Sequence, residues 1–200
     1  MRRSAVSLAD IADFHNLARA FHFAARGKRG RSDVESFRDK LDSELATLRA
    51  DILDGTVSVG AARSFRIRDP KPGIIHAPAF RERVPHHAIM AHAGPVLDRA
   101  PIFDTYACRT GKGSLAAVRR VLDHAGHFSW FTQIDIAGYF AHIDHGVLLG
   151  LLARTFKDAG PMALFGRIIG AHRDGPGRGL PIGASDLAQC RYGWPDRVGP

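Results

Sequence analysis

The sequence is poor in cysteine and has no long hydrophobic run. Only Cys108 and Cys190 occur in 200 residues, far apart and outside any CxxC pattern. This scarcity argues against a disulfide scaffold and against a cysteine zinc site, since both need several suitably spaced thiols. The central apolar run, residues 147–153, is too short to span a bilayer. Acidic residues at positions 10 and 13 argue against a signal peptide, so we expect no membrane partner and a cytoplasmic protein.

Motifs of common enzyme classes are also missing. No serine lies in a GxSxG elbow, and no HExxH pair is present. The segment RTGKGS (109–114) resembles a phosphate loop, but the first glycine of the P-loop spacing would fall on Tyr106. The sequence therefore offers no support for serine hydrolase, zincin or Walker-type chemistry.

What is abundant is positive charge. The 28 Lys and Arg residues outnumber 20 Asp and Glu, the net charge is +8, and arginine far exceeds lysine. Because guanidinium binds phosphate in a bidentate fork, this excess favours a phosphate-rich partner. Charge alone is equally consistent with a basic protein that binds no polyanion.

Hydrophobic periodicity predicts a mainly helical chain with a hairpin and one further strand. Ser32, with Glu35 three residues later, has the pattern of a capping box at the start of the second helix. The predicted helices cover residues 7–26, 33–53, 80–97, 113–125, 145–156 and 161–172, the hairpin 64–78, and the strand 129–135.

The segment SWFTQID (129–135) ends on Asp135, and its side chains would alternate between two faces of a strand. We expect one face to pack on helices while Asp135 faces an open cleft. Such a carboxylate is suited to holding Mg²⁺ against a phosphate. Two-metal chemistry needs several carboxylates, so Asp135 alone is insufficient, and ordinary strand-to-helix punctuation also fits the spacing.

Four segments occur in a characteristic order: FRIRDPKPGIIHAPAFRERVPHHAIM (65–90), DTYACRTGKGSLAAVRR (104–120), QIDIAGYFAHIDHGVLLGLL (133–152) and GRGLPIG (177–183). In this order they resemble bacterial reverse transcriptases of the retron, diversity-generating and group II intron-like branch. The resemblance covers roughly residues 60–183. It implies an α+β fold, the fingers and partial palm of a right-hand polymerase, incomplete at the C-terminus.

The resemblance also implies roles for individual residues. Asp135 matches the first catalytic aspartate, a ligand of both Mg²⁺ ions, and the Ile136 carbonyl would help to bind one ion. Phe140 matches the steric gate that disfavours a 2′-hydroxyl on the incoming nucleotide. Asp144 matches a structural helix cap.

Further residues are implied to contact substrates, which would be a dNTP, an RNA template and a DNA or RNA primer. The fingers residues expected to contact the triphosphate and template are Lys71, Arg81 and Arg83. The loop expected to lie against the template and the nascent base pair contains Gly179, Pro181 and Gly183.

The sequence departs from the family in several places. Gly73 stands where the family usually has a basic residue, and Pro85 replaces an aliphatic one. The YxDD motif, which supplies the remaining metal-binding carboxylates, is absent from the 200 residues. We therefore expect a truncated or frameshifted chain that does not polymerise alone. The sequence does not indicate whether an accessory protein completes the site. The alternative functions are a non-catalytic basic RNA-binding module and a generic basic domain.

The helical pattern and the extent of the resemblance divide the chain into three expected regions. Residues 1–58 form an N-terminal helical region, and residues 59–183 form the fingers and partial palm. Residues 184–200, rich in glycine and proline, form a divergent tail that we expect to be disordered.

Overall fold

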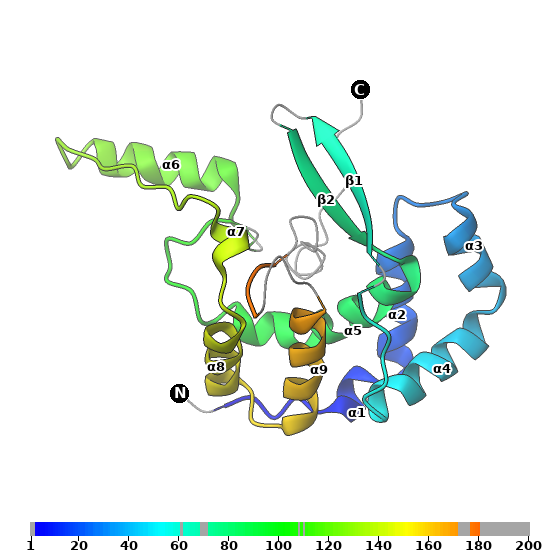
Figure 1. The fold of residues 1–200 in the computed structure, drawn as a ribbon. Coiled ribbons are helices and arrows are strands. Elements are labelled where there is room, and N and C mark those ends of the chain that lie inside the picture. Colours follow the sequence, from blue (N-terminus) through cyan, green and yellow to red (C-terminus); the bar gives the residue numbers. More distant parts are fainter. Residues whose placement is uncertain are drawn as a thin grey trace.

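A computed structural model describes residues 3–60, 62–68, 72–107, 109, 111–171 and 177–180 (Figure 1). The described chain is mainly helical and carries a two-stranded hairpin. Among the described helices, none is both long and apolar enough to cross a bilayer. The elements are α1 (Leu8–Ile11), α2 (Phe14–Ala25), α3 (Ser32–Asp39), α4 (Leu41–Leu53), β1 (Ala62–Arg68), β2 (Pro72–Pro78), α5 (Phe80–Leu97), α6 (Ser114–Ala125), α7 (Tyr139–His142), α8 (His145–Thr155) and α9 (Ala159–Gly170).

The first predicted helix is divided into two. Ser7 and Asp10 form a capping box around α1, and the Asp13 side chain accepts a hydrogen bond from the Asn16 amide at the start of α2. Aspartate satisfies the free amides of a new first turn, so Asp13 starts a second helix rather than continuing the first.

The second predicted helix is also divided, with Lys40 between α3 and α4. The predicted cap at Ser32 is wrong, since Arg31 occupies the N-cap position and makes no side-chain capping bond. Glu35 instead accepts a hydrogen bond from the Gly30 amide, at 3.2 Å, and so stabilises the preceding loop.

The core forms where α2 packs against α5. Phe21, Phe37 and Phe80 bring together α2, α3 and α5, with ring centroids 5.4 to 6.0 Å apart. The buried Asn16 amide donates to the carbonyls of Ile11, at 2.9 Å, and Ala88, at 3.1 Å. This side chain thus joins α5 to the end of α1 and satisfies polar groups that burial would otherwise leave unpaired.

The C-terminal helices cover another side of this core. Phe156 and Phe165 lie in contact at the α8–α9 junction, with ring centroids 5.3 Å apart. The Ser4 amide donates to the Thr155 carbonyl at 2.7 Å, and the Lys157 amide donates to the Ser4 carbonyl. The N-terminal segment is therefore fixed along the end of α8.

The predicted hairpin is confirmed, with β1 and β2 antiparallel and Phe65 opposite Ile75. Arg66 and Arg68 are exposed, as the basic strand face predicted. The strand predicted over 129–135 is not formed in the described structure. A strand needs a hydrogen-bonding neighbour, and in the described residues β1 and β2 pair with each other and not with this segment.

We expect Phe37→Ala to lower the free energy of unfolding by about 3–5 kcal/mol, because it leaves a cavity between three helices. The half-exposed Phe23 on α2 provides a control, and Phe23→Ala is expected to cost about 1 kcal/mol. Urea unfolding followed by circular dichroism measures both. Equal losses would contradict a core centred on the three buried rings.

Candidate functional site

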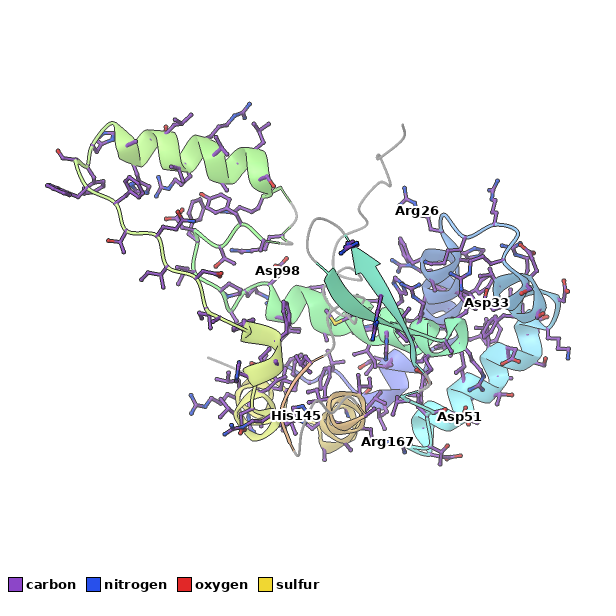
Figure 2. The ribbon with its side chains drawn as sticks, turned by 45° about the horizontal axis from the view of Figure 1, so that its top comes forward. Arg26, Asp33, Asp51, Asp98, His145 and Arg167 are labelled. Carbon is purple, nitrogen blue, oxygen red and sulfur yellow. The ribbon has the colours of Figure 1, made fainter. Side chains whose placement is uncertain are left out.

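Asp135 lies in an extended, solvent-exposed segment, residues 129–137. Within the described chain, the backbone of this segment makes no hydrogen bond. Trp130, Phe131 and Ile134 are 91%, 92% and 84% exposed. Together with α6, the segment forms an arm that projects from the helical body on the side away from α3 and α4 (Figures 1 and 2).

The expected division of this segment into a packed face and an open face is wrong. Trp130 and Ile134 would lie on one face and Phe131 and Asp135 on the other, yet all four are exposed. The apolar stripe of α6 is exposed as well, including Leu115, Val118 and Leu122. Asp135 therefore stands on an accessible arm and not at the edge of a described sheet.

Gly138 turns the chain from this arm into the short helix α7. Its φ is +61°, in the left-handed region, and an added Cβ would lie 3.0 Å from the His142 ring. Glycine is therefore favoured by the backbone conformation, and a side chain here would also crowd the His142 ring. The turn sets Phe140 beside Tyr139, with ring centroids 5.4 Å apart, and leaves Phe140 about half exposed.

The structure joins two of the four sequence segments. The Leu180 amide donates to the Phe140 carbonyl at 2.8 Å, and the Gly179 amide donates to the Ile143 carbonyl at 2.9 Å. The buried His145 ring donates through Nε2 to the Gly179 carbonyl at 2.8 Å. Residues 179–180 are thus held against residues 140–145, which follow the arm.

Sequence reasoning missed this use of His145 and of Arg178. Arg178 lies 3.8 Å from the Asp144 carboxylate across an isolated antiparallel bridge. Asp144 also caps α8 by accepting from the Val147 amide at 3.0 Å, as predicted. The local sequence identifies the cap, but no pattern in it indicates a partner 34 residues away.

Arg81 is committed to neighbours within the protein. Its guanidinium donates to the Glu44 carboxylate at 3.0 Å and to the Asp51 carboxylate at 3.1 Å, linking α5 to α4. Burial acts to lower the pKa of Arg81, but hydrogen bonds to these two carboxylates outweigh it and raise the pKa above its ordinary value. Arg83 is half-buried on the same helix.

The implied substrate contacts are therefore only partly gathered. The Phe140 carbonyl is hydrogen-bonded to Leu180, the residue after Gly179, whereas Arg81 links α5 to α4. In Figure 1 the start of α5 is separated from the arm by the length of that helix. Lys71, Pro181 and Gly183 lie outside the described residues.

The implied Mg²⁺ site is likewise incomplete. Across the residues that the structure describes, no group of three or more His, Cys, Asp or Glu side chains could hold a metal ion. Asp135 supplies one exposed carboxylate, and the Ile136 carbonyl is its neighbour in the chain. A two-ion centre needs more carboxylates than this, so the described residues do not fit one.

Comparison with known proteins adds no assignment. No protein-family model matches the chain, and no curated protein is similar to it.

We expect Arg81→Met to lower the free energy of unfolding by about 1 kcal/mol at low salt, because Glu44 and Asp51 lose their shared cation. The loss should shrink as salt screens these partly exposed charges. Denaturant unfolding measures it, and Arg49→Met on the exposed face of α4 is the control. Unchanged stability would contradict a structural role and leave Arg81 available for a ligand.

Asp144 should make stability depend on acid pH. The Val147 amide, the Gly146 amide and the Arg178 guanidinium hold the pKa of Asp144 below its ordinary value of 3.8. The carboxylate thus stabilises the fold above the ordinary value, and this contribution disappears as pH falls through the lower folded-state pKa.

Asp144→Asn keeps a side-chain acceptor for the cap but does not titrate. As pH falls below 3.8, the melting temperature of the wild type should therefore drop more steeply than that of the variant. Asp54→Asn, at another exposed carboxylate, is the control. If the melting temperatures of Asp144→Asn and wild type fell in parallel with pH, ionisation of Asp144 would not contribute to the acid dependence of stability.

Proposed function

We propose that this chain derives from an RNA-directed DNA polymerase and comprises its fingers and part of its palm. In this proposal the chain acts in the cytoplasm and binds an RNA template, a primer and a dNTP. Asp135 and the Ile136 carbonyl would take part in binding Mg²⁺ for nucleotidyl transfer only together with the further carboxylates that these 200 residues lack. Phe140 contacts the sugar of the dNTP, and Arg83 and Lys71 contact the triphosphate and the template.

The order of the four sequence segments carries the proposal, since each alone has an ordinary structural explanation. The contacts of Phe140 and Gly179 support it, because they bring the implied sugar-contacting residue beside the implied template loop. The exposed Arg66 and Arg68 of β1 and the net charge of +8 are suited to a phosphate-rich partner. Arg81 is better explained as a structural ion pair.

A second candidate function is a basic RNA-binding module without chemistry. The lone carboxylate of Asp135 on an exposed arm favours it, as do the exposed Arg66 and Arg68. The two functions differ in one respect that can be measured. A polymerase recognises the dNTP that pairs with the template, whereas a simple RNA-binding module does not respond to the identity of a nucleotide.

We expect no primer extension by these 200 residues on an RNA template with Mg²⁺. The dNTP complementary to the next template base should nevertheless tighten binding to a labelled template–primer, while a mismatched dNTP should not. Asp135→Ala should abolish this response, and Phe140→Ala should remove the preference for a dNTP over the matching ribonucleotide. Gel-shift titration measures these effects.

Asp54→Ala removes an exposed carboxylate elsewhere and should leave the response intact. Binding that is strong but indifferent to every nucleotide would favour the RNA-binding module. Extension that depends on Asp135 would confirm the polymerase and contradict the expected inactivity.

A further inference from the structure

A basic pocket lies at the junction of α2 and α3. These two helices lie on the other side of the molecule from the arm that carries Asp135 (Figures 1 and 2). The pocket has a volume of about 540 Å³. The residues that line it are His22, Ala25, Arg26, Gly27, Arg29 and Arg38. All three arginines are exposed, and Figure 2 shows Arg26 projecting away from the end of α2.

The acidic residues nearest in sequence do not neutralise two of these arginines. Asp33 is paired with Arg31 at 2.8 Å, and Glu35 is paired with Arg38. In the described part of the chain, neither Arg26 nor Arg29 makes an ion pair or a side-chain hydrogen bond. Two guanidinium groups at the pocket are therefore available to an anion.

Capping of α2 does not account for these two arginines. Cations are favoured near the C-terminus of a helix, where free carbonyls carry partial negative charge. Lys28 serves this purpose, since its Nζ donates to the Ala24 carbonyl at 2.9 Å. Arg26 and Arg29 make no such contact with the described carbonyls, so the helix end does not explain why both are present.

We propose that this pocket binds the phosphate backbone of single-stranded RNA, with Arg26 and Arg29 as the phosphate ligands. The volume lies in the range that holds a nucleotide-sized ligand. Each planar guanidinium can hold a phosphate through two hydrogen bonds. The choice of RNA over a free phosphate compound rests on the proposed function, and the open, exposed position of both side chains suits a strand that passes across the surface.

The test compares Arg26→Ala/Arg29→Ala with Arg49→Ala/Arg154→Ala, which removes the same charge from exposed positions on α4 and α8. Affinity for a fluorescein-labelled single-stranded RNA is measured by anisotropy between about 50 and 200 mM salt. The pocket variant should bind about tenfold more weakly at low salt, and its log–log salt slope should be shallower by about 1.4. The control variant should keep most of the wild-type affinity and most of the wild-type salt slope.

Arg26→Lys/Arg29→Lys keeps the charge and should retain most of the salt slope. The melting temperatures of all variants should match that of the wild type, since these side chains are exposed. The proposal would be overturned if the pocket and control variants lost RNA affinity equally. A lysine variant with the same salt slope as the alanine variant would also overturn it. Inorganic triphosphate that binds more tightly than RNA, and only with both arginines, would also overturn it in favour of a free polyphosphate.

The outcomes separate this proposal from the proposed function. RNA bound through Arg26 and Arg29 without any response to a matched dNTP upholds the pocket and contradicts the polymerase. A matched-dNTP response that survives loss of both arginines, with unchanged RNA affinity, contradicts the pocket alone.

Discussion

The structure depends on the burial of α2 against α5. Phe21, Phe37 and Phe80 place three rings from three helices in mutual contact, and Asn16 satisfies two buried carbonyls at the same junction. Burying such rings supplies much of the apolar stabilisation available to a small helical body. Helix α5 runs from the β1–β2 hairpin toward the segment that precedes α6. The packing of α5 therefore also determines where the hairpin and the arm leave the helical body.

Unlike the core, the arm is exposed to solvent. Its apolar side chains on α6 and on residues 129–137 remain exposed, and the extended backbone has no partner among the described residues. Accessible apolar surface of this kind is typical of a region that binds another surface, or of one prone to aggregation. The residue that the resemblance makes most important, Asp135, therefore lies in the part of the chain with the fewest constraints of its own.

Local patterns predicted much of the fold. The helix predicted over residues 80–97 is confirmed as α5 despite its two prolines, and the turn residues after Arg68 correctly predicted the hairpin. The division of residues 7–26 was missed, although Asp13 is a strong N-cap and could have indicated it. For the candidate site, Asp144 as a cap was correct, whereas the internal ion pairs of Arg81 could not be read from its neighbours in sequence.

By itself, the sequence determined most of the helical segments and the hairpin, the basic charge, and the identity of the residues available for chemistry. These properties arise from side-chain periodicity and from capping groups a few residues apart. Only the tertiary structure decided that residues 129–135 lack a strand partner, that Arg81 is held by Glu44 and Asp51, and that His145 holds Gly179. The contacts of Arg81 and His145 join groups 30 to 37 residues apart, which come close only once the core has positioned their elements.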